Sequence, residues 1–124
     1  MSLAGALLAD LVGALLLTLA VELPVAALLG LRSRRALMAV TAVNMLTNPL
    51  LNLALLLLSI GGLRAGTPAS WLAVGLLEGL ALMTEWLVLA SVLDESRRRL
   101  FGIVLAMNAA SFTVGLAVLG VPVR

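Results

Sequence analysis

The sequence predicts an all-α membrane protein, a single transmembrane domain (1–124) in which four helices form an up-down-up-down bundle. Two observations lead to this fold class. Hydrophobic residues make up 63% of the chain and charged residues only 11%, whereas soluble domains are about half apolar and about a quarter charged. The apolar residues also form four long runs, and short connections between them hold most of the arginines. A water-soluble domain of 124 residues could not bury this much leucine and alanine.

The predicted helices are the apolar runs at approximately 3–31, 36–60, 69–93 and 100–121. Each run reaches the roughly 20 residues that a helix needs to cross a hydrocarbon core about 30 Å thick. Helices are expected because lipid offers backbone groups no hydrogen-bond partner, and the runs are too long and continuous for the strands of a barrel.

Each helix has signals of its own at its start. The first run lacks the preceding positive charge of a secretory signal peptide, so we expect a retained transmembrane segment. The second run follows the arginine-rich connection 31–35. Before the third run, Thr67 or Ser70 is a suitable N-cap and Pro68 a suitable first-turn residue. The fourth run follows the connection 94–99, and connections this short place neighbouring helices antiparallel.

The arginines are distributed unevenly between the two ends of the predicted bundle. Six of the eight lie in the first and third connections and two lie at the other end. The six are Arg32, Arg34, Arg35, Arg97, Arg98 and Arg99, and the two are Arg64 and Arg124. Because cytoplasmic loops carry an excess of basic residues, the sequence predicts a bacterial inner (cytoplasmic) membrane protein with both termini outside. Dual topology is the alternative, and the arginine bias opposes it.

Two segments of the chain repeat each other. Glu22, Ser33, Asn44 and Thr47 in the first segment match Glu85, Ser96, Asn108 and Ser111 in the second. The offset is 63 residues for the glutamates and for the two serines that precede arginine pairs, and 64 for the other two matches. The sequence therefore predicts two parallel two-helix repeats, in halves 1–62 and 63–124.

One polar residue of each predicted helix lies at the same depth. Glu22, Asn44, Glu85 and Asn108 are each nine or ten residues from an arginine-rich connection. At a rise of 1.5 Å per residue this separation is roughly 14 Å, which is close to the bilayer midplane. The sequence thus predicts a polar layer buried in the membrane.

The candidate site extends this layer toward the predicted outer side. It comprises Glu22, Glu85, Asn44, Asn108, Glu78, Asn48, Thr47 and Ser111. No basic residue lies at the midplane, so Glu22 and Glu85 are expected to be protonated or to hold a bound cation. Histidine and cysteine are absent, which leaves these two glutamates as candidate metal ligands of a kind that suits hard cations.

A structural interpretation of these polar residues stays open. Asn, Thr and Ser in transmembrane helices often bond one helix to another, and a protonated glutamate can do the same. Glutamine would hold helices together at lower cost, which favours a functional role for the glutamates. Pro24 and Pro49 free backbone carbonyls beside the layer, as in the discontinuous helices of many transporters, although proline kinks are also common in ordinary membrane helices.

Two stretches of the chain carry a resemblance. Residues 44–52 read NMLTNPLLN, and after a helix with paired glutamates residues 108–112 read NAASF. With these stretches the chain resembles small uncharacterised bacterial four-helix integral membrane proteins. The resemblance implies the fold and no activity.

The leading hypothesis is a small transporter or channel, with no cofactor, that passes protons or a hard cation along the polar layer. Four helices are expected to enclose little more than a side-chain core. A pathway in the lipid bilayer would then need a homo-oligomer (dimer or larger) or a membrane partner subunit. The alternative is a non-catalytic subunit or scaffold of a larger membrane complex.

An intramembrane enzyme that acts on lipid is the third hypothesis. Paired carboxylates could serve it as acid and base. The arginines are most simply topology anchors, but some of them could also contact lipid phosphates, namely Arg34, Arg35, Arg97 and Arg98. The net charge of only +2 gives no reason to expect a nucleic-acid partner.

Overall fold

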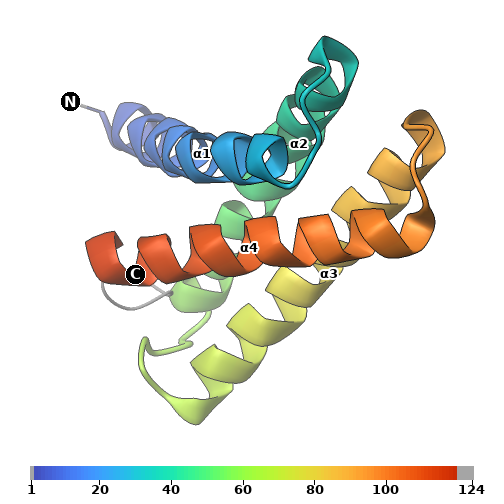
Figure 1. Ribbon diagram of the computed structural model, residues 1–124. Coiled ribbons are helices and arrows are strands. Elements are labelled where there is room, and N and C mark those ends of the chain that lie inside the picture. The colour runs from blue at the N-terminus through green and yellow to red at the C-terminus, as the bar shows by residue number, and fades with distance from the viewer. Residues whose placement is uncertain (1, 120–124) are drawn as a thin grey trace.

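The computed structural model describes residues 2–119, which form four long α-helices and no strand (Figure 1). The helices are α1 (Leu3–Leu28), α2 (Arg34–Ile60), α3 (Pro68–Val92) and α4 (Arg97–Leu119). Each is long and apolar enough to cross a membrane. The predicted all-helical class and four transmembrane segments are confirmed to this extent. Residues 120–121 of the fourth predicted helix, and Arg124, lie outside the described residues.

Side-chain oxygens cap the starts of the helices. Ser2, Ser33 and Thr67 are the N-caps of α1, α2 and α3, and each accepts a hydrogen bond from a backbone N–H three residues later. The Ser96 hydroxyl accepts in the same way from the Arg99 N–H at the start of α4. Such caps satisfy amide groups that a helix leaves without an internal partner. The prediction of Thr67 as N-cap, followed by Pro68 in the first turn, is confirmed.

The four helices pack in a closed ring of neighbours. Helix α1 packs against α2 and α4, and α3 packs against the same two helices. In Figure 1, α1 lies beside α4 although the two are farthest apart in the sequence. The ring encloses a space between the helices, and the side chains that face it decide what the bundle holds.

The apolar core lies mainly near the two arginine-rich connections. We call its buried residues the apolar cluster: Ala26, Leu31, Ala36, Val40, Leu89, Leu100, Ile103, Val104 and Met107. A much smaller cluster of Leu55 and Val74 lies toward the other end of the bundle. Between the two clusters most of the buried side chains are polar, with Val43 the apolar exception.

The outer surface is rich in large apolar side chains. Every helix exposes leucines, among them Leu16, Leu50, Leu72 and Leu105. Glu22 and Glu85, in contrast, are almost fully buried. Apolar residues outside and charged residues inside are the distribution expected of a bundle surrounded by lipid.

Neither proline interrupts its helix. Helix α1 continues through Pro24 and α2 continues through Pro49. The freed carbonyls therefore do not open into the broken helices by which many transporters build ion sites.

Arginines tie the ends of the two helix pairs to each other. Arg35, at the start of α2, donates from Nη2 to the carbonyl oxygen of Val92 in α3 at 2.6 Å. Arg99, at the start of α4, donates from Nη2 to the carbonyl oxygen of Leu29 after α1 at 3.3 Å and is also ion-paired with Glu95. The pair α1–α2 thus caps the C-terminal end of α3, and the pair α3–α4 caps the C-terminal end of α1.

Trp86 is the main aromatic link between α3 and α4. Its indole N–H donates to the Arg97 carbonyl at 2.8 Å, and its ring meets Phe101 edge-on at 5.2 Å. We expect Trp86→Phe to lower the free energy of unfolding by about 1 kcal/mol, because the hydrogen bond is lost while an aromatic ring is kept.

Denaturant unfolding in detergent micelles measures this change. Trp71→Phe is the matched control, since the Trp71 side chain is 44% exposed and its indole bonds to none of residues 2–119. Equal losses in the two variants would show that the Trp86 hydrogen bond adds nothing.

Candidate functional site

Five of the sequence-predicted site residues meet at the centre of the bundle and are buried. Glu22 comes from α1, Asn44 and Thr47 from α2, Glu85 from α3 and Asn108 from α4. The two glutamate side chains are only 1% and 2% exposed. The predicted polar layer is therefore one continuous cluster to which every helix contributes.

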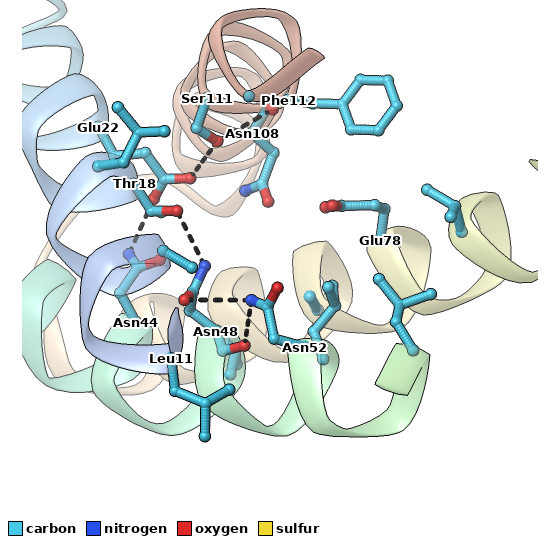
Figure 2. Close-up of a pocket in the computed structure, with 18 of the residues that line it drawn as sticks. Leu11, Thr18, Glu22, Asn44, Asn48, Asn52, Glu78, Asn108, Ser111 and Phe112 are labelled. Atoms are coloured by element: carbon cyan, nitrogen blue, oxygen red, sulfur yellow. Dashed lines mark hydrogen bonds between the residues drawn. The ribbon is translucent and has the colours of Figure 1, made fainter. Parts of the chain in front are cut away.

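The Glu22 carboxylate accepts one hydrogen bond on each oxygen. The Asn44 amide donates from Nδ2 to Oε2 at 2.8 Å. The Ser111 hydroxyl donates to Oε1 at 2.7 Å (Figure 2). The amide thus comes from the same helix pair as Glu22, and the hydroxyl comes from the other pair.

The Glu85 carboxylate is held in the same way. The Asn108 amide donates from Nδ2 to Oε2 at 2.6 Å. The Thr47 hydroxyl donates to Oε1 at 2.9 Å. Again the amide comes from the same helix pair and the hydroxyl from the other, so the two carboxylates share one bonding pattern.

The four donors also contact backbone carbonyls of their own helices. Nδ2 of Asn44 lies 3.1 Å from the Val40 carbonyl oxygen, and Nδ2 of Asn108 lies 3.0 Å from that of Val104. The Thr47 hydroxyl lies 3.0 Å from the Val43 carbonyl oxygen. The Ser111 hydroxyl lies 3.2 Å from the Asn108 carbonyl oxygen. Each donor is thereby fixed to its helix as well as to a carboxylate.

A cavity of about 200 Å³ begins at these carboxylates. It extends away from the arginine-rich connections, to Leu7 on α1 and Leu116 on α4. All eight sequence-predicted site residues line it, and no arginine does. The expectation that four helices enclose little more than a side-chain core is corrected here, because small and polar side chains leave a cavity in the half of the interior that lies away from the arginine-rich connections.

Glu78 projects from α3 into this cavity (Figure 2). Its side chain is half-buried and forms no hydrogen bond or ion pair with any of residues 2–119. Asp10 lines the cavity from α1 and is exposed. The cavity therefore carries acidic groups from its exposed part to its buried end, with no arginine among its lining residues to neutralise them.

A chain of polar side chains follows the opposite wall. The Asn48 amide donates to the Thr18 hydroxyl at 2.8 Å, and the Asn52 amide donates to the Asn48 side-chain oxygen at 3.4 Å (Figure 2). The sequence reasoning missed Thr18. The spacing from Glu22 could have identified it, because Thr18 precedes Glu22 by four residues and so lies one turn away on the same face of α1.

The donor set around the glutamates is a poor match to a metal ion. Among residues 2–119 no group of three or more Asp, Glu, His or Cys side chains could hold one. Each oxygen of Glu22 and Glu85 already faces an N–H or O–H donor. These two glutamates alone would leave a hard cation short of its usual six or more oxygen ligands.

The four arginines that were predicted to contact lipid phosphates differ in their hydrogen bonds. Arg34, Arg97 and Arg98 are exposed, and their guanidinium groups bond to no described residue. Arg35 instead donates a hydrogen bond to the Val92 carbonyl oxygen. Its position therefore has a structural explanation within the chain.

Comparison with protein-family models, with curated proteins and with solved structures finds no match to this chain.

Proposed function

We propose that the protein is a small integral membrane transporter or channel that moves protons or a hard cation through the buried Glu/Asn layer. One observation carries the proposal. Two carboxylates that have no cationic partner in the described part of the chain lie almost fully buried at the closed end of a cavity, among polar side chains from all four helices. A carboxylate at the centre of a bilayer costs several kcal/mol, so such residues usually mark ion or proton pathways.

The topology in the membrane is part of the proposal. The helices would cross up, down, up and down, with both termini outside and the arginine-rich connections in the cytoplasm. The two parallel halves would each supply one Glu–Asn pair and one hydroxyl. The matching bonds at Glu22 and Glu85, and the matching arginine caps at Val92 and Leu29, support this arrangement.

In this orientation the cavity would open to the outside and the apolar cluster would close the cytoplasmic half. The cavity forms within one chain, so the carboxylate site does not itself need a second copy. A homo-oligomer in the membrane, or a partner subunit, remains a prediction about how a full pathway is completed.

Flux through proteoliposomes tests the proposal. With purified protein and an imposed ion gradient, we expect wild-type protein to pass protons or a hard cation. Glu22→Gln and Glu85→Gln should each reduce that flux roughly tenfold or more, because an amide neither carries charge nor exchanges a proton. The amide can still accept a hydrogen bond, so the fold should be kept.

Glu95→Gln is the matched control, since Glu95 lies in the connection before α4, outside the cavity, and should leave flux unchanged. Full flux in both site variants would contradict the proposal. Absence of flux from correctly folded wild-type protein would contradict it too, and would favour a non-catalytic subunit. Purification from native membranes would then be expected to yield a stoichiometric partner.

A further inference from the structure

We propose that the ion handled at this site is the proton, with Glu22 and Glu85 as its carriers and the Thr47 and Ser111 hydroxyls as switches between two hydrogen-bond arrangements. The inference rests on the proposed function and narrows it to one ion. It is carried by the geometry of the two hydroxyl groups and of the two amides that lie opposite them.

Each hydroxyl has two acceptors within hydrogen-bond distance but only one proton to donate. For Thr47 they are the Glu85 Oε1 at 2.9 Å and the Val43 carbonyl oxygen at 3.0 Å. For Ser111 they are the Glu22 Oε1 at 2.7 Å and the Asn108 carbonyl oxygen at 3.2 Å. A hydroxyl is both donor and acceptor, and its hydrogen rotates to suit its partners.

This geometry satisfies both states of the carboxyl group without moving a heavy atom. When Glu85 is ionised, the Thr47 hydroxyl donates to its Oε1. When Glu85 binds a proton on Oε1, that new O–H donates to the Thr47 oxygen, and the Thr47 hydrogen turns to the Val43 carbonyl. Ser111 serves Glu22 in the same way, with the Asn108 carbonyl as the second acceptor.

The asparagines do not switch. Both hydrogens of the Asn44 amide are engaged, one by Glu22 Oε2 and one by the Val40 carbonyl. Both hydrogens of the Asn108 amide are engaged in the same way, by Glu85 Oε2 and the Val104 carbonyl. Each amide therefore holds one carboxyl oxygen still while the other oxygen gains or loses the proton.

The same arrangement disfavours a metal cation. A metal ion needs lone pairs, but the donors around both carboxylates present N–H and O–H hydrogens to them. Binding a cation at either carboxylate would require both of its donors to turn away, and one of the two is an asparagine amide that is also held by a backbone carbonyl. A proton requires only that one hydroxyl hydrogen rotate.

The route for the proton leads into the cavity. The titratable groups that line it are Asp10 and Glu22 from α1 and Glu78 and Glu85 from α3, while α2 and α4 contribute none. Glu78 and Glu85 are two helical turns apart, about 10 Å along the axis. The cavity of about 200 Å³ has room for several water molecules between them, and the carboxyl, amide and hydroxyl groups on its walls offer that water hydrogen-bond partners. The proton released by Glu85 would pass through this water to Glu78 and to Asp10.

The experiment compares hydroxyl variants in proteoliposomes under an imposed pH gradient, with a trapped pH-sensitive dye as the readout. We expect Thr47→Val and Ser111→Ala together to slow proton flux roughly tenfold or more. Thr47→Ser and Ser111→Thr, which keep a hydroxyl at both positions, should retain most of the flux. Thr84→Val is the matched control, because the Thr84 hydroxyl is exposed and bonds only to the Leu80 carbonyl of its own helix.

Infrared difference spectroscopy provides a second readout that does not need transport. Between low and high pH, wild-type protein should lose the bands of protonated carboxyl groups, and Glu22→Gln and Glu85→Gln should each remove one band. Thr47→Val should shift the band that Glu85→Gln removes. A threonine that does not bond to the protonated carboxyl group would leave the frequency of that band unchanged.

The outcomes separate this inference from the proposed function. If wild-type protein passes Na⁺, K⁺ or Mg²⁺ but no protons, and the glutamate variants stop that flux, the proton assignment fails while the transport proposal stands. If no ion passes, the proposed function itself fails. Full proton flux and an unshifted carboxyl band in the variant without both hydroxyls would overturn the switching role of Thr47 and Ser111.

Discussion

A cysteine that replaces Ala81 is expected to react fully with a membrane-impermeant maleimide added from the outside, whereas a cysteine that replaces Gly79 is not. Both residues lie on α3 at nearly the same depth. Ala81 lines the cavity, while Gly79 faces outward with no atom within 4 Å of an added Cβ. The reaction needs a thiolate, which forms in water and not in lipid. Labelling should therefore report which face of α3 meets water.

The chain contains no cysteine of its own, so the background of this experiment is clean. Val104→Cys serves as a third position, since Val104 is fully buried in the apolar cluster, and it should stay unlabelled from either side. Labelling at Ala81 should also block proton flux, because the maleimide adduct would fill the cavity. Reaction only from the cytoplasmic side would reverse the proposed orientation. No reaction at Ala81 from either side would contradict a water-accessible cavity.

Replacement of Asn44 or Asn108 by leucine is expected to lower the free energy of unfolding by about 2 kcal/mol for each. Within residues 2–119 each asparagine is the only amide donor to its carboxylate, and it also bonds to its own helix backbone. Leucine would leave one oxygen of a buried glutamate without a partner, and that unmade bond costs more than an average interhelical bond contributes.

Unfolding in detergent micelles, followed by far-ultraviolet circular dichroism, measures this loss. Asn52→Leu is the matched control on α2, because the Asn52 amide bonds only to Asn48 within the same helix. We expect the control to lose less than about 0.5 kcal/mol, as substitutions away from buried partners usually do. Similar losses for Asn44→Leu and Asn52→Leu would mean that the bond to Glu22 adds no more to the free energy of unfolding than a bond within one helix.

The common level of four site residues along the bundle was predictable from the sequence because helical rise is nearly constant. Counting residues from the arginine-rich connections placed Glu22, Asn44, Glu85 and Asn108 at one level, and the structure brings these four side chains into one cluster. The helix ends were predictable for a similar reason. Thr67 and Pro68 have local preferences that do not depend on distant residues.

The choice of partners was not predictable in the same way. Spacing shows that Ser111 and Asn108 share a face of α4, but not that Ser111 meets Glu22 while Asn108 meets Glu85. That pairing depends on the order of the helices around the bundle, and the periodicity of a single helix does not predict this order. Arg35 illustrates the same limit, because its bond to Val92 joins residues 57 positions apart.

The cavity was missed because packing volume does not follow from a pattern of polar residues. The sequence shows where small and polar side chains lie along each helix, but the volume left between four helices depends on how far apart they pack. Thr18 was missed for a simpler reason. It has no counterpart in the second half, where Ala81 lies 63 residues later, so a comparison of the two halves passes over it.

The exchange of hydroxyls between the helix pairs has a consequence for how such a chain can be built. Residues of α1 and α2 alone would leave Glu22 without its Ser111 donor, and residues of α3 and α4 alone would leave Glu85 without Thr47. Two separately expressed halves should therefore regain the site only when they associate, as two subunits would. Joining them in one chain allows the halves to specialise. Glu78 has Leu15 at the matching position, so the carboxylate that lies in the cavity two turns from Glu85 has no counterpart two turns from Glu22 in the first half.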